Sequence, residues 1–229
     1  MPGPLPVSMS ACRKGRVLAA VYALLLTGCS PLSTVQDRGK PAALRTYVYD
    51  CESGFRFVAR SVGDTIWLFL PTEAVQLPRA KSGSGEKYSG RTTNFSRAGA
   101  NAVLQHGQQT YRRCQNNDAA AVWEHARFNG VDFRAAGTQP GWSLELTLDD
   151  EIVFVEDRSR TVYRFPTPTP EIDAAARKTT YLAESSEHQL TLSLEARPCT
   201  GPASAEPLEV TVRIKLDDEI YQGCGMALQ

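Results

Sequence analysis

The chain has 229 residues, of which 42% are hydrophobic and 22% charged, values that are ordinary for a globular protein. Its 25 Lys/Arg balance its 25 Asp/Glu, so the total charge says nothing about partners, and we expect no nucleic-acid partner. The length allows one large domain or two small ones.

The first residues of the chain have the composition of an export signal. Residues 1–29 contain no acid, and three basic residues precede the apolar run 17–26. That run has the length of a signal peptide and is too short to anchor a protein by spanning a bilayer. It ends in Leu-Thr-Gly-Cys at Cys29, which resembles the lipobox of bacterial lipoproteins, where the cysteine is lipidated and becomes the first mature residue.

The resemblance implies a signal peptide over residues 1–28 and a lipid on Cys29, so we expect the membrane as a partner through that anchor. Residues 29–43 are polar and contain Pro and Gly, which predicts a tether. Ser30 is not acidic. By resemblance to the sorting rules of enteric bacteria, this implies the outer membrane, at its periplasmic face.

The remaining cysteines predict disulfides. Cys12 leaves with the signal and Cys29 takes the lipid, which leaves an even number for an oxidising compartment: Cys51, Cys114, Cys199 and Cys224. Three pairings are possible, and we expect Cys51–Cys114 and Cys199–Cys224 because each pair brackets one β-rich segment. We expect no metal and no cofactor, since the chain has no Cys-x-x-Cys and its three histidines are scattered.

Residues 44–116 predict a small all-β module. Runs rich in β-branched and aromatic residues alternate with turn residues, at 46–49, 55–59, 65–70, 73–78, 92–96, 102–105 and 110–114. The run 65–70 is continuously apolar, which predicts a buried strand with Trp67 in the core. The Ser/Gly-rich stretch 81–90 predicts a loop. Many short strands with frequent turns are typical of a small barrel or sandwich.

Residues 117–140 predict a connector with one short helix over 119–128, capped by Asp118. A second β-rich module is expected over residues 141–229. It begins with a strictly alternating strand that places Trp142 in the core and continues at 151–156, 160–165, 178–183, 189–196, 208–216 and 219–222. The Pro-rich segment 166–170 predicts an exposed loop. The expected fold class is therefore all-β, with two modules joined by a partly helical connector.

The charges of the two modules differ in sign. Residues 44–116 hold ten Lys/Arg and five Asp/Glu, a net charge of +5, whereas residues 141–229 hold eight and sixteen, a net charge of −8. The excess of basic residues in the first module is typical of a solvent-exposed barrel face. It is also compatible with binding an anionic polymer.

Three patterns in the first module resemble the family of membrane-bound inhibitors of c-type lysozyme. They are Tyr49-Asp50-Cys51 at the start, the segment 82–88 in the middle and Tyr111-Arg112-Arg113-Cys114-Gln115 at the end. The family's Ser-Gly-x-x-Tyr pattern, with a basic residue before the tyrosine, is met by Ser84, Gly85, Lys87 and Tyr88. Residues 141–229 resemble a segment found beside this domain in some bacterial lipoproteins, which implies no activity.

The resemblance implies an eight-stranded antiparallel barrel closed by Cys51–Cys114. It also implies an inhibitor, not an enzyme, whose Ser-Gly loop enters the active-site cleft of a host c-type lysozyme. The implied lysozyme-binding residues are Ser84, Gly85, Lys87, Tyr88 and Arg97. The chemistry is reasonable, because a serine hydroxyl can donate to one of the two carboxyl groups of a glycosidase and accept from the other.

One position departs from the family pattern. The family usually has Lys before the glycine that aligns with Gly99, whereas this chain has Ala98. Arg97, Lys87 or Arg91 could supply the charge, although neighbouring residues of a strand point to opposite faces. The alternative function is therefore a structural or peptidoglycan/polymer-binding envelope lipoprotein that has kept the barrel and lost inhibition. The net charge of +5 also favours this alternative, since c-type lysozymes are generally basic.

An enzyme is not expected. The segment Gly83-Ser84-Gly85 is not the Gly-x-Ser-x-Gly elbow of a serine hydrolase, and no histidine stands in a recognisable partner position.

Overall fold

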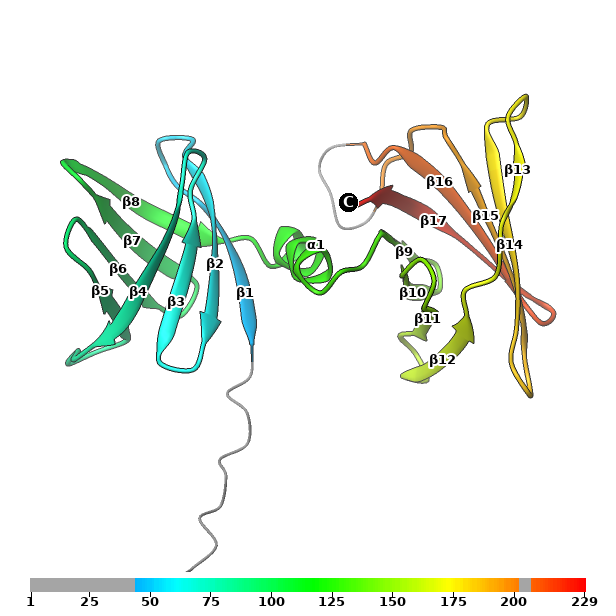
Figure 1. The fold of residues 1–229 in the computed structure, drawn as a ribbon, viewed down its shortest axis with the longest axis horizontal. Helices are drawn as coiled ribbons and strands as arrows, with labels where there is room; N and C mark the ends of the chain where they lie inside the picture. Colours follow the sequence, from blue (N-terminus) through cyan, green and yellow to red (C-terminus); the bar gives the residue numbers. More distant parts are fainter. Residues whose placement is uncertain (1–43, 202–206) are drawn as a thin grey trace, which may run out of the picture. The chain divides into compact units, whose positions relative to one another are not determined.

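The computed structural model describes residues 44–201 and 207–229. These residues form a closed barrel, one short helix and a second, open sheet (Figure 1). The expected signal peptide, Cys29 and the tether lie outside the described residues. Within the described part of the chain, no helix is both long and apolar enough to cross a membrane.

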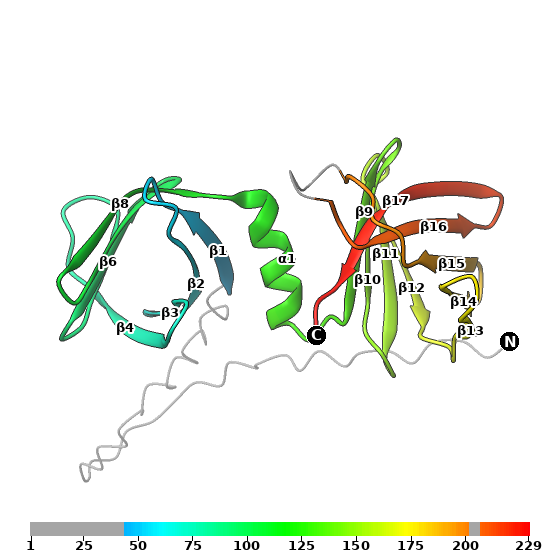
Figure 2. The same ribbon diagram turned by 90° about the horizontal axis from the view of Figure 1, so that it is seen from above.

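Eight antiparallel strands follow one another around the barrel in chain order, and the last pairs with the first. They are β1 (Arg45–Asp50), β2 (Arg56–Val62), β3 (Thr65–Phe69), β4 (Ala74–Ala80), β5 (Glu86–Ser89), β6 (Thr93–Ala98), β7 (Asn101–His106) and β8 (Gln109–Asn116). Figure 2 looks into this ring. The barrel implied by the family resemblance is thus confirmed.

Alternation along each strand places one row of side chains inside the barrel. The largest buried ones are Tyr49, Phe57, Ile66, Leu68, Leu77, Tyr88, Phe95 and Leu104. The prediction that Trp67 lies in this core was wrong, since the side chain is 37% exposed. Because Ile66 and Leu68 both point inward, Trp67 between them must point outward, and the apolar run is buried on one face only.

The prediction of a loop over residues 81–90 was also partly wrong. Its second half is the strand β5, which pairs with β4 and β6. The Ser/Gly composition hid this strand because only one of its residues, Tyr88, is fully buried.

The barrel closes over a short seam. β1 and β8 pair only at Tyr49↔Asn116 and Asp50↔Gln115. Cys51 and Cys114 occupy the next position of this ladder and form a disulfide. The covalent bond therefore continues the closure where the hydrogen-bonded ladder ends.

The helix α1 (Asp118–Phe128) follows directly after β8. Its N-cap is Asn117 and not Asp118 as predicted, because the Asn117 side-chain oxygen accepts a hydrogen bond from the Ala120 N–H (2.9 Å). The Asn117 amide nitrogen also donates to the Asp50 carboxylate (3.0 Å), which ties the start of the helix to the barrel.

The second sheet has nine antiparallel strands in the order β12-β11-β10-β9-β17-β16-β15-β14-β13 and curves around its own core. The strands are β9 (Phe133–Thr138), β10 (Gly141–Leu146), β11 (Glu151–Glu156), β12 (Thr161–Pro166), β13 (Glu171–Asp173), β14 (Lys178–Glu184), β15 (Gln189–Glu195), β16 (Val210–Leu216) and β17 (Glu219–Ala227). Trp142 is buried in this core, as predicted. The disulfide Cys199–Cys224 lies in this module.

Two strands of this sheet were missed. β9 falls within the predicted connector and pairs with both β10 and β17, so the sheet begins at Phe133 rather than at residue 141. The Ala- and Gly-containing sequence of β9 carries little β propensity, and its neighbours on both sides hold it in the sheet. All three residues of β13 are exposed, so that strand has no hydrophobic alternation to reveal it.

Candidate functional site at the Ser-Gly loop

The Ser-Gly loop, residues 81–85, joins β4 to β5 and is exposed along its whole length. The last cross-strand pair before it is Ala80↔Lys87. Because successive strands of the barrel run in opposite directions, this loop lies at the same end of the barrel as the β6–β7 turn. That end, called the loop end below, therefore presents the residues of the family's middle motif to solvent.

A hydrogen bond within the loop orders its tip. The Ser82 hydroxyl donates to the Ser84 carbonyl oxygen (2.6 Å), a local side-chain-to-backbone bond typical of serine turns. Ser84 itself is exposed, and no group in residues 44–201 or 207–229 forms a hydrogen bond with its hydroxyl. That hydroxyl is free to donate and to accept, whereas the hydroxyl of Ser82 is already engaged.

Gly85 is the glycine that the loop requires. Its φ is +69°, and a Cβ added there would meet the Arg97 carbonyl oxygen closer than the 3.0 Å that real Cβ atoms respect. The missing side chain lets the start of β5 lie against the end of β6. Gly83, on the other side of Ser84, has no neighbour within 4 Å of the corresponding position.

Tyr88 supports the loop from inside the barrel. Its side chain is 1% exposed, and its hydroxyl donates to the Glu86 carboxylate (2.9 Å). Burial, together with this bond to Glu86, raises the pKa of Tyr88 to about 12. With its ring buried, Tyr88 lies where it can support the loop from behind, and its contact with lysozyme stays a prediction.

Arg97 is also turned toward the barrel. Its guanidinium carbon lies 4.0 Å from the centroid of the Tyr47 ring, a cation–π arrangement. Burial alone would lower the pKa of Arg97, but a hydrogen bond with Tyr47 and the nearby Tyr49 and Glu86 raise it. The Arg97 guanidinium therefore stays charged, and the groups that interact with it, Tyr47, Tyr49 and Glu86, belong to the barrel.

The remaining positions differ in how they meet the solvent. Ala98 is exposed at the end of β6, beside Gly85. Lys87 is exposed on the outer wall of β5, since its neighbour Tyr88 points inward. Arg91 follows β5 in the turn at the opposite end of the barrel, which removes it from the loop. Lys81, which the sequence reasoning missed, is an exposed cation next to Ser82; its position directly before the Ser-Gly motif was the available signal.

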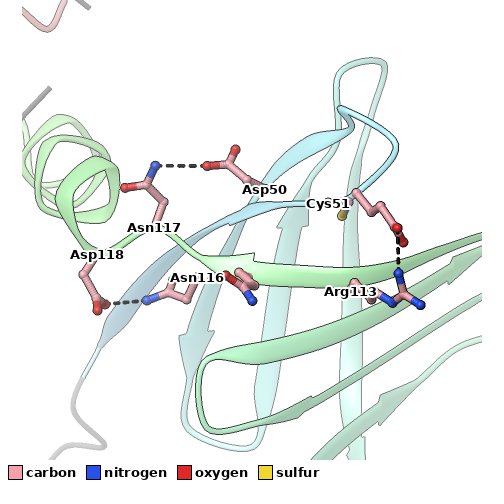
Figure 3. A pocket seen from close by; sticks show the side chains of 8 residues that line it. Asp50, Cys51, Arg113, Asn116, Asn117 and Asp118 are labelled. Atoms are coloured by element: carbon pink, nitrogen blue, oxygen red, sulfur yellow. Dashed lines mark hydrogen bonds and ion pairs between the residues drawn. The ribbon is translucent and has the colours of Figure 1, made fainter. Parts of the chain in front are cut away.

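A depression of about 500 Å³ lies beside the barrel seam, where β1 meets β8 (Figure 3). Six of the lining side chains are paired with one another: Asn117 with Asp50, Asn116 with Asp118, and Arg113 with Glu52. Hydrogen bonds from Arg56, helped by the one from Asn117, lower the pKa of Asp50. These pairs connect the barrel seam to the start of α1, so we interpret the depression as a structural junction.

The fold and the loop together define a class of protein: a small closed antiparallel barrel that presents one braced, exposed hydroxyl-bearing loop. Residues 49–113 match the family model described as membrane-bound lysozyme-inhibitor of c-type lysozyme. The match begins in β1 and ends in β8, so it covers the barrel and leaves α1 and the second sheet outside. The family resemblance predicted from the sequence is confirmed over these residues.

No match to this chain was found among the curated proteins or among the solved structures.

Proposed function

We propose that this chain is a bacterial envelope lipoprotein whose barrel inhibits host c-type lysozyme by inserting the Ser-Gly loop into the active-site cleft. The observation that carries this proposal is the exposed Ser84 hydroxyl, free of intramolecular hydrogen bonds in the described chain, on a loop braced by Ser82 and Gly85. The family model matched by these residues is named for inhibition of c-type lysozyme.

The chemistry requires no reaction by the inhibitor. A glycosidase of this kind works with a carboxylic acid and a carboxylate on either side of the scissile bond. The Ser84 hydroxyl donates to the carboxylate and accepts from the acid, so it occupies the site where the substrate would react. Because the loop is ordered before binding, little conformational entropy is lost when it enters the cleft.

The five predicted contact residues divide into two groups under this proposal. Ser84 and Gly85 form the tip that enters the cleft, and Lys87 contacts the rim from the barrel wall. Tyr88 and Arg97 hold the loop end from within, through Glu86 and Tyr47. Lys81 takes the role of the cation that pairs with the ionised carboxylate, since it is exposed and adjacent to the loop tip.

The location follows from the export signal and the cysteine at position 29. We propose an acyl anchor on Cys29 and residence at the periplasmic face of the outer membrane, where an inhibitor meets lysozyme before it reaches peptidoglycan. Two disulfides, Cys51–Cys114 and Cys199–Cys224, are in keeping with an oxidising compartment.

The experiment is a titration of c-type lysozyme with residues 30–229, measured as the rate of peptidoglycan lysis. We expect lysis to slow with wild-type protein and to recover with Ser84→Ala. The matched control is Ser53→Ala, which removes an exposed hydroxyl from the β1–β2 turn at the opposite end of the barrel. An unchanged lysis rate at excess wild-type protein would reject the proposal.

A second candidate is an envelope lipoprotein that binds polymer and does not inhibit lysozyme. The observation in its favour is the combination of Ala98, which replaces the family's lysine, with Arg97, whose charge is held on Tyr47. Parallel pull-downs on immobilised lysozyme and on peptidoglycan separate the two: retention on lysozyme supports inhibition, and retention on peptidoglycan alone supports this second function.

A further inference from the structure

The outer wall of β5, β6, β7 and β8 carries an open depression of about 490 Å³. Its lining contains no residue of the Ser-Gly loop. Its lining is mostly polar, with the apolar residues Val103 and Phe95 beside Lys87, Asn94, Ser96, Gln105, Thr110 and Arg112. Phe95 belongs to the barrel core, whereas the other lining side chains face outward, because their inward-pointing neighbours form that core.

The register arranges this wall into two parallel rows. Lys87 pairs with Ser96 and Ser96 with Val103, and Val103 lies opposite β8 at Arg112. The second row runs from Asn94 through Gln105 to Thr110. One row therefore has a cation at each end, three strand spacings or about 14 Å apart, and the other row offers only amides and a hydroxyl.

A β-bulge fixes the position of Arg112. Ala102 pairs with Cys114 and Leu104 with Tyr111, so two residues of β8 lie opposite the single residue Val103. The extra residue is Arg113, whose φ of +48° is unusual for a side chain other than glycine. Bulges of this kind change the direction of a side chain and are found near functional sites.

The two cations at the ends of the row are electrostatically unsatisfied within the described chain. Arg113 pairs with Glu52 (2.7 Å), whereas neither Lys87 nor Arg112 forms an ion pair with any residue of 44–201 or 207–229. Apart from Val103 and Phe95, the other lining side chains are neutral donors and acceptors, which can replace the hydration of sugar hydroxyls. The module as a whole has a net charge of +5.

We propose that this wall is a binding site for an anionic saccharide, with Lys87 and Arg112 pairing with acidic groups and the two polar rows hydrogen-bonding the sugar hydroxyls between them. The two unpaired cations and the mostly polar lining, in which Val103 is the one outward-facing apolar side chain, favour this ligand over a protein partner, which would require an apolar centre. The site shares Lys87 with the proposed lysozyme contact, whereas Arg112 belongs to the saccharide site alone, and it gives the polymer-binding alternative a definite location on the barrel.

The test measures binding of residues 30–229 to oligogalacturonate, an oligosaccharide with one carboxylate per sugar, beside uncharged dextran of the same length. We expect binding to the anionic oligosaccharide only, weakening as salt is added. Arg112→Gln and Lys87→Gln should each weaken it about threefold and together about tenfold. The matched control, Arg45→Gln with Arg158→Gln, removes two exposed charges outside the depression and should leave the affinity unchanged.

Several outcomes would overturn the proposal: no binding of oligogalacturonate, equal binding of dextran, binding to anionic lipid vesicles alone, or an equal loss in the control variant. A thermal melt of each variant separates loss of the site from loss of the fold. The test is also separable from the lysozyme assay, because Arg112→Gln should bind saccharide weakly and still inhibit lysozyme, whereas Ser84→Ala should do the reverse.

Discussion

The carbonyl oxygen of Arg97 occupies the space that a side chain at Gly85 would need. Arg97 therefore contributes to the loop end twice, through its backbone against Gly85 and through its guanidinium on the ring of Tyr47. The conformation of the loop therefore depends on β6 as well as on the loop's own sequence. Substitutions can distinguish residues that maintain this conformation from residues that contact a partner.

Gly85→Ala should destabilise the barrel by about 1–3 kcal/mol, because it combines a steric overlap with a left-handed backbone conformation. Chemical denaturation measures this cost, and the lysozyme assay should show weaker inhibition. Gly83→Ala is the matched control: its position is open and its φ is not positive, so stability should change little. Equal losses in the two variants would contradict the assignment.

Ser84→Ala should weaken lysozyme inhibition by roughly tenfold or more, since a hydrogen bond to a charged group contributes about 1.5–3 kcal/mol. Its melting temperature should equal that of the wild type, because the hydroxyl has no partner within residues 44–201 and 207–229. Ser82→Ala should weaken inhibition less, through the lost bond to the Ser84 carbonyl. A stronger effect of Ser82→Ala would show that loop order, and not contact, dominates.

Ala98→Lys should raise the affinity for c-type lysozyme several-fold, because it restores a cation beside Gly85 where the family usually has one. Ser53→Lys adds the same charge at the opposite end of the barrel and should have no such effect. Inhibition constants for the two variants provide the comparison. If Lys81 already pairs with the carboxylate, Lys81→Gln should lower the wild-type affinity and Ala98→Lys should rescue it.

Replacing Cys51 and Cys114 together by Ala should cost about 4 kcal/mol, the value expected from chain entropy for a cross-link between residues 63 positions apart. The barrel depends on this bond because the seam holds only two residue pairs. Denaturation of the oxidised and reduced wild type, followed beside the double variant, measures the loss. Reduction should have no further effect on the barrel of the variant.

Asp50 should make the barrel sensitive to acid. Its hydrogen bonds with Arg56 hold its pKa below the ordinary value near 4. The group therefore contributes stability that is fully present above that value and is lost as the pH falls through the folded pKa. In denaturation curves between about pH 2 and pH 7, Asp50→Asn should be less stable than the wild type at neutral pH and equal to it at the acid end. A constant difference across this range would argue against the linkage.

Many of the strands could be predicted from local patterns, because apolar and polar residues that alternate along the sequence point to opposite faces of a strand. Trp67 and Asn117 show where such patterns stop. A continuous apolar run does not tell which face of a strand is buried. Asn117 and Asp118 are adjacent and both suit an N-cap, so the sequence pattern does not tell which of them caps the helix. β9 was missed for a related reason, since its strand state is imposed by β10 and β17 and not by its own residues.

The site was predictable in composition and less so in orientation. The motif correctly identified the exposed loop with Ser84, but it could not assign Tyr88 and Arg97 to the barrel interior, because that depends on the register of β5 against β6. Lys87 and Arg112 are 25 positions apart in the chain. They end one row of the wall because β6 and β7 lie between their strands β5 and β8 in register, and no sequence motif marks such a row.

The strand order of the barrel has a consequence for how the module forms. Every strand except the first pairs with its predecessor, so seven hairpin contacts can form one after another with short loops and little entropic cost. Only the return of β8 to β1 joins distant parts of the chain. The rate at which a newly made barrel closes should therefore depend on this last encounter, in which Cys51 and Cys114 meet and form their disulfide.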